Sequence, residues 1–127
     1  EAEELSEGDV ALQGDNLQIT YNAGNSAFGM IVSVDGNGAV TLHFPVSESE
    51  EPELEVGGDV QLPYAYRLDN APRFEAFYFI TSNTGFEVSD ILDRIRRQAD
   101  SIVSNPERSL ELPRDFAVES IVIRKGA

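Results

Sequence analysis

Residues 28–44, FGMIVSVDGNGAVTLHF, consist of two segments of alternating apolar residues joined by a run of turn-forming residues. Every second side chain is apolar from Phe28 to Val34, and again from Val40 to Phe44. A period of two is typical of a strand with one buried face. The joint, Asp35-Gly36-Asn37-Gly38, contains residues that readily take positive φ in tight turns. The stretch therefore predicts a β-hairpin, with His43 on the solvent-facing side of its second strand.

The same period recurs on both sides of this hairpin. It predicts further strands at residues 17–21, 60–62, 64–68 and 116–124, and a short one at 54–56. The segment 74–81, FEAFYFIT, is instead apolar on both faces. Strands of this kind lie at the centre of a structure, so we expect it to be covered by a sheet on one side and by a helix or second sheet on the other.

One helix is predicted after this central strand. Six apolar residues recur at helical spacing between positions 88 and 102, and Asn105-Pro106 ends the pattern. The fold class is therefore mainly β: an antiparallel β-sandwich, or a strongly curved sheet, of about seven strands with one amphipathic helix against it. Because the helix separates the strands at 74–81 and 116–124, a crossover connection with one parallel pair of strands stays open.

The length of 127 residues suffices for one domain. Residues 1–9 are rich in Glu and Asp and read as an acidic tether or frayed end, which leaves residues 10–127 as a single β-rich domain. The first residue is Glu rather than Met, so we expect the chain to be part of a longer protein. No apolar run approaches the roughly 20 residues of a membrane-spanning helix, and we expect no direct membrane contact by this segment.

The net charge of −14 is distributed unevenly along the chain. Residues 1–66 contain 13 acidic residues and no Lys or Arg, whereas residues 67–127 contain 10 acidic and 9 basic residues. Phosphate-binding surfaces need clustered Lys and Arg, so this composition disfavours nucleic acid and anionic lipid as partners. The absence of cysteine excludes disulfides, thiol catalysis and thiolate zinc sites. No phosphate-binding glycine loop is present, and we expect no cofactor.

Two charged groups are candidate contact sites for a protein or small-ligand partner. Residues 48–59, ESEEPELEVGGD, predict a long acidic surface loop, and the helix carries a small basic patch. The candidate partner-binding residues are Glu48, Glu50, Glu51, Glu53, Glu55, Arg94 and Arg97. The simpler explanation of both groups is a solvated surface, because an exposed ion pair contributes only about 0–1 kcal/mol.

Two other classes of function stay open as alternatives. A small hydrolase would have to use His43, the only histidine, as the base of a triad, or a pair of carboxylates. No nucleophile-elbow motif accompanies His43. A calcium-dependent interaction module would have to use residues 35–38 or the acidic loop, and neither has the ligand spacing of a calcium loop.

Three stretches carry a likeness to a known family. They are GDNLQI at 14–19, GMIVSVDGNGAVT at 29–41 followed by Phe44-Pro45, and LDNAP at 68–72 followed by FYFIT at 77–81 and Phe86. Together they resemble a bacterial domain of unknown function found at the C-terminal end of larger chains. In some of those chains the domain follows a zinc-binding, anti-sigma-factor-like head and a single membrane span. In others it accompanies a caspase-like peptidase.

The resemblance covers residues 8–98 and carries no catalytic residues, and the acidic segment Glu48–Glu55 departs from it. It implies an accessory or sensory module, in a periplasmic or otherwise extracytoplasmic part of a membrane-anchored protein. We therefore expect a non-enzymatic accessory, binding or sensing domain of a larger bacterial regulatory protein. Such a domain would present loops, such as residues 47–58, to its partner.

Overall fold

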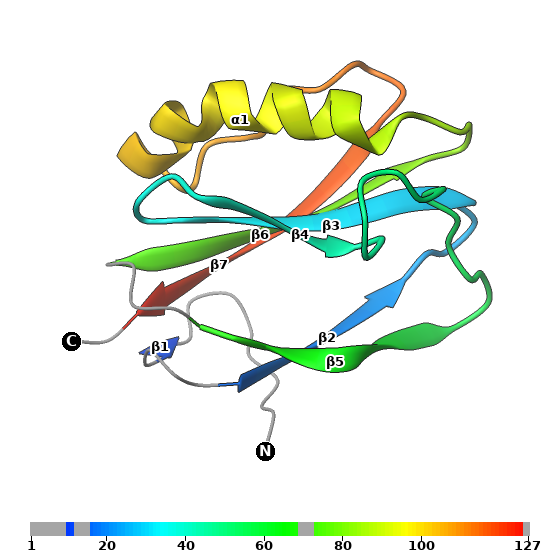
Figure 1. The fold of residues 1–127 in the computed structure, drawn as a ribbon, viewed down its shortest axis with the longest axis horizontal. Helices are drawn as coiled ribbons and strands as arrows, with labels where there is room; N and C mark the ends of the chain where they lie inside the picture. Colours follow the sequence, from blue (N-terminus) through cyan, green and yellow to red (C-terminus); the bar gives the residue numbers. More distant parts are fainter. Residues whose placement is uncertain (1–9, 12–15, 69–72, 126–127) are drawn as a thin grey trace.

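The computed structural model describes residues 10–11, 16–68 and 73–125, which form three layers (Figure 1). A helix covers one face of a five-stranded sheet, and a two-stranded sheet covers the other. The described part is thus mainly β and sandwich-like, as predicted, while the predicted tether at residues 1–9 lies outside it. The elements are β1 (Val10–Ala11), β2 (Asn16–Asn22), β3 (Phe28–Asp35), β4 (Val40–Phe44), β5 (Asp59–Arg67), β6 (Phe74–Ser82), α1 (Val88–Ser104) and β7 (Ala117–Lys125).

The large sheet has the strand order β1-β7-β6-β3-β4, and the small sheet pairs β2 with β5. The chain could have crossed over through the helix to a parallel strand, but this connection does not form. β6 and β7 are antiparallel neighbours, with Thr81 opposite Ala117. Residues 105–116 are long enough to lead the chain from the end of α1 back to the end of β6. The parallel pair is instead β1 with β7, and a strand as short as β1 leaves no periodic signal in the sequence.

The helix packs on the large sheet through a core of apolar and aromatic side chains. The predicted apolar face of α1 is confirmed, and its buried residues are Val88, Ile91, Leu92, Ile95, Ala99 and Ile102. They cluster with the side chains of β3 and β6 that point to the same side, among them Val32 and Ile80. Apolar residues at a spacing of three and four form a stripe on one side of a helix, which is why this helix covers a flat sheet face.

The predicted hairpin is formed by β3 and β4, and Asp35 closes its turn. The Asp35 carboxylate Oδ1 accepts hydrogen bonds from the backbone N–H groups of Asn37 and Ala39, at 2.9 and 3.0 Å. Gly38 has a φ of 84°, a conformation that glycine takes without a steric penalty. The turn geometry therefore accounts for these residues without a bound ion.

Two of the predicted strands differ in the structure. No strand forms at 54–56. Instead, Glu53 forms a single β-bridge with Phe28 of β3, and Leu54 is buried in a cluster with Tyr21 of β2 and Ile31 of β3. The segments predicted at 60–62 and 64–68 are one strand, β5, whose pairing with β2 shifts register around Pro63. Proline has no N–H to donate to the ladder, so it falls at the irregular point of the sheet.

Candidate functional site

The small sheet covers only part of the large-sheet face on which it packs. On one side β5 lies over β4, where the ring centroids of Tyr66 and His43 are 4.5 Å apart. Next to it β2 lies over the middle of the sheet, where Tyr21 contacts the ring of Phe79 of β6 with centroids 5.5 Å apart. No further strand of the described chain follows β2, so part of the β6 and β7 face stays uncovered.

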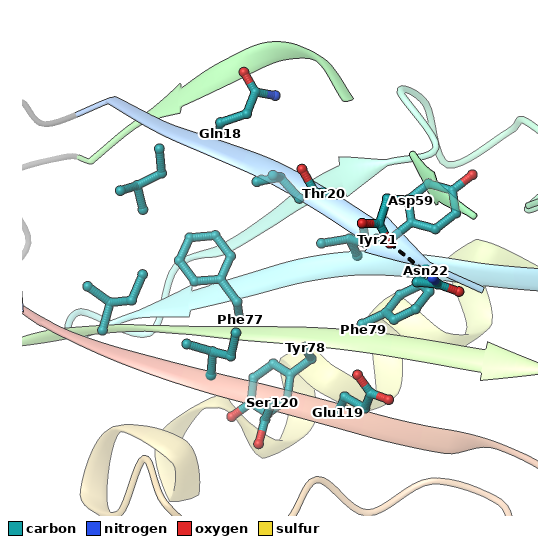
Figure 2. A pocket seen from close by; sticks show the side chains of 15 residues that line it. Gln18, Thr20, Tyr21, Asn22, Asp59, Phe77, Tyr78, Phe79, Glu119 and Ser120 are labelled. Carbon is teal, nitrogen blue, oxygen red and sulfur yellow. Dashed lines mark hydrogen bonds between the residues drawn. The ribbon is translucent and has the colours of Figure 1, made fainter. Parts of the chain in front are cut away.

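This uncovered position is a groove of about 550 Å³ between β2 and the face formed by β6 and β7 (Figure 2). A volume between about 300 and 1,000 Å³ is typical of ligand-binding pockets. The groove is lined by Leu17, Gln18, Ile19, Thr20, Tyr21, Asn22, Ile31, Asp59, Phe77, Tyr78, Phe79, Glu119, Ser120, Ile121 and Ile123.

The floor of the groove is apolar and aromatic. Phe77 and Phe79 point from β6 toward β2 and are only half buried, although they lie in a central strand (Figure 2). Beside them Ile121 of β7 keeps 40% of its surface exposed. Solvent-accessible aromatic and aliphatic side chains gathered in a concave site are the usual setting for an apolar ligand group.

The rim of the groove is polar, and its charged groups are acidic. The lining residues with a formal charge are Asp59 and Glu119, both exposed. Asn22 Nδ2 donates a hydrogen bond of 2.9 Å to Asp59 Oδ1, which fixes that carboxylate at one end of β2 (Figure 2). The groove therefore combines an apolar floor with a negative rim.

A second group of chemistry-bearing residues lies inside the interface between the two sheets. His43 Nε2 and Ser33 Oγ are hydrogen-bonded at 2.8 Å, and the imidazole also contacts the rings of Tyr66 and Phe77. Tyr66 donates a hydrogen bond of 3.4 Å to the carboxylate Oε2 of Glu75, which is itself buried. Burial lowers the pKa of His43 to about 4, so the imidazole is neutral at pH 7.

The predicted position of His43 on a solvent-facing side is wrong. His43 is 2% exposed, because the small sheet covers the side of β4 that the alternation alone would leave in water. The pairing of β3 with β4 is also irregular: the neighbours Ile31 and Val32 pair with Phe44 and Leu42, so His43 lies at a bulge of β4 between them. The sequence contains no signal for either effect, since both depend on strands that are distant in the chain.

The acidic loop is anchored through its apolar residues, and its carboxylates face water. Glu48, Glu50, Glu51, Glu53 and Glu55 are all exposed, whereas Pro52 and Leu54 between them are buried. The backbone N–H of Glu55 donates to the hydroxyl of Tyr21 at 3.0 Å. This bond and the burial of Leu54 fix the loop against the small sheet, and none of residues 48–55 lines the groove.

The helix arginines are separate from this loop. Arg94 and Arg97 are exposed on α1, on the other side of the large sheet from the groove, and the Arg97 side chain donates to the backbone oxygen of Asp93. In the described residues, the ion pairs are Arg96 with Asp93, Arg108 with Glu111, and Arg124 with Glu107. The structure thus does not bring the two predicted charged groups together, and a partner for either group stays a prediction.

Three further observations bear on the alternatives. The described residues contain no cluster of three or more His, Cys, Asp or Glu side chains that could hold a metal ion. Within the same part of the chain, no helix combines the length and the apolar character needed to cross a membrane. Ser33 and His43 do not line the groove, and Ser33 is fully buried.

The groove residues were not identified from the sequence. Phe77 and Phe79 belong to the strand predicted to be covered on both faces, and that prediction holds for most of β6. Which aromatic side chains of β6 stay accessible to solvent depends on how far the small sheet extends over that strand. Comparison with protein families, with curated proteins and with solved structures finds no match for this chain.

Proposed function

We propose that this chain is a non-catalytic binding or sensing module, and that its ligand binds in the groove between β2 and the face of β6 and β7. The observation that carries the proposal is the uncovered part of the large sheet, where Phe77, Phe79 and Ile121 stay accessible in a groove of about 550 Å³. An apolar sheet face that is left exposed, where another layer would normally cover it, commonly marks a binding site for apolar groups of a ligand or partner. The resemblance noted for residues 8–98 supports an accessory role in a larger bacterial regulatory protein.

The burial of the histidine favours this proposal over a hydrolase. A triad requires that the nucleophile reach the carbonyl carbon of the substrate. His43 is 2% exposed and Ser33 is 0% exposed, beneath the aromatic rings of Tyr66 and Phe77. The pair instead satisfies two polar groups inside a sheet interface, which is what buried hydroxyl and imidazole groups need.

A neutral fluorescent probe tests the proposed binding site. N-phenyl-1-naphthylamine carries no charge at pH 7, so the net charge of the protein does not repel it. We expect saturable binding of one probe per chain, with an affinity that falls at least tenfold in the variant Ile121→Asp. The matched control is Val46→Asp, because Val46 is another exposed apolar residue, 71% accessible, that does not line the groove.

Three results would contradict the proposal. The first is the absence of saturable binding by the folded protein. The second is an equal loss of affinity in the two variants, with circular dichroism confirming that both are folded. The third is turnover of ester or peptide substrates that disappears in His43→Ala, since that result would assign a catalytic role to the buried pair.

A further inference from the structure

The groove runs along a strand edge that has no partner in the described chain. Among the described strands, β2 pairs only with β5. Backbone N–H and C=O groups of alternate residues point to opposite edges of a strand, so half of those in β2 point away from β5. The lining includes six consecutive residues of β2, Leu17 to Asn22. The groove therefore follows β2 from Leu17 to Asn22.

The uncovered position has the geometry of a missing strand. A strand added beside β2 would lie about 4.8 Å from it, and about 10 Å above the large sheet. At that place its inward side chains would meet Phe77, Phe79 and Ile121, which line the floor. Six residues of β2 correspond to about 20 Å of paired edge at roughly 3.3 Å per residue.

The charge around the groove selects the kind of strand. Both charged lining residues, Asp59 and Glu119, are acidic and exposed. Within the small sheet, β2 has no charged residue, and β5 has Asp59 at one end and Arg67 at the other. A second copy of this chain carries the same net charge of −14 and would be repelled. The complementary partner is basic.

Resting on the proposed function, we infer that the occupant of the groove is a segment of a basic partner protein that adds a third strand to the small sheet along the edge of β2. Its apolar side chains would face Phe77 and Ile121, and a Lys or Arg at the end next to Asn22 would lie near Asp59 and Glu119 (Figure 2). A small apolar molecule would fill the same floor but leave the edge of β2 without main-chain partners. Addition of a strand uses both features, the main chain for affinity and alternate side chains for specificity.

Three octapeptides test this inference against the full chain. The first is capped KVKVKVKV, which alternates basic and apolar residues. The second is the same peptide N-methylated at its four central residues, so that it cannot donate backbone hydrogen bonds there. The third is EVEVEVEV, in which the charge is reversed. Binding is followed by displacement of the naphthylamine probe and by hydrogen exchange of the backbone amides of residues 17–22.

We expect the first peptide, at up to millimolar concentration, to displace the probe and to slow amide exchange in β2 at least fivefold, with weaker binding to Ile121→Asp than to Val46→Asp. The N-methylated and acidic peptides should bind at least tenfold more weakly. The inference is overturned if no peptide slows exchange in β2, or if either control peptide binds as well as the first. Protection of β2 that grows with protein concentration alone would also overturn it, because the occupant would then be a second copy.

The same measurements separate the two proposals. If the probe binds and responds to Ile121→Asp while no peptide slows exchange in β2, the groove is a site for a small apolar ligand and only the inference on the strand fails. If neither probe nor peptide binds, both proposals fail.

Discussion

Protonation of the single buried imidazole should destabilise the protein between pH 6.5 and pH 4. His43 has an ordinary pKa of 6.5, which burial lowers to about 4 in the folded protein. Between these two values the unfolded chain binds a proton at this site and the folded chain does not. The free energy of unfolding therefore falls as the pH falls through this window, and it is unaffected by this group above pH 6.5.

The size of the effect follows from the difference between the two pKa values. At about 1.4 kcal/mol per pH unit, the difference between 6.5 and about 4 corresponds to a loss of about 3 kcal/mol on acidification. A stability of about 5–15 kcal/mol is usual for a domain, so this one group is a substantial part of it. Below pH 4 the folded protein also binds the proton, and the loss stops growing.

The assay compares the wild type with His43→Gln, whose amide can still bond to Ser33 but does not titrate. Urea unfolding of both proteins at pH 7 and at pH 4.5 gives two losses of stability, and the acidic residues contribute equally to each. The wild type should lose about 2–3 kcal/mol more than the variant. Because the chain has one histidine, an NMR titration of the imidazole can be assigned without ambiguity. A midpoint near 6.5, or equal losses in the two proteins, would refute the burial argument.

Three further predictions concern the free energy of unfolding, measured in urea. Gly29→Ala should lower the free energy of unfolding by about 1–3 kcal/mol, because its Cβ would lie 2.8 Å from the backbone oxygen of Ile80. The control Gly85→Ala, whose Cβ would lie 3.7 Å from the nearest atom, should cost much less. Equal costs would contradict the close contact at Gly29. Asp35→Ala should cost about 2–4 kcal/mol by removing two hydrogen bonds of the hairpin turn, and Asp35→Asn, which keeps an acceptor oxygen, should lose less than half of that. Tyr78→Phe should not lower stability, because the Tyr78 hydroxyl is buried with no hydrogen-bond partner among the described residues. The same burial raises the pKa of Tyr78 to about 12. A loss of stability above about 1 kcal/mol would show that the hydroxyl has a partner.

The sequence predicts the elements of this fold better than their arrangement. The hairpin of β3 and β4 and the helix α1 depend on residues close together in the chain, where side-chain period and turn residues are informative. The division into a large and a small sheet depends on pairs such as Asn16 with Arg67, about 50 residues apart. No local pattern records which distant strands pair, so the layers become visible only in the structure.

The same limit explains the outcome for the candidate sites. The acidic residues 48–55 are exposed as predicted, since charge and a proline are local signals for a surface loop. His43 is buried and the groove went unpredicted, because both follow from where the small sheet lies and where it ends. The amino-acid composition of an aromatic strand such as β6 does not tell whether a neighbouring layer covers all of the strand or only part of it.

The small sheet also has a consequence for the order of assembly. The turn of the β3–β4 hairpin closes a loop of a few residues, whereas the nearest pair between β2 and β5, Asn22 with Asp59, is 37 residues apart. The entropy of loop closure rises with length by about 2 kcal/mol over that range, and a sheet of two strands is marginal without a surface to rest on. We therefore expect the large sheet and α1 to form first, with β2 and β5 docking late in folding. The groove takes shape only in that last step, so a strand that binds there would stabilise the completed fold by slowing the undocking of the small sheet rather than by speeding its docking.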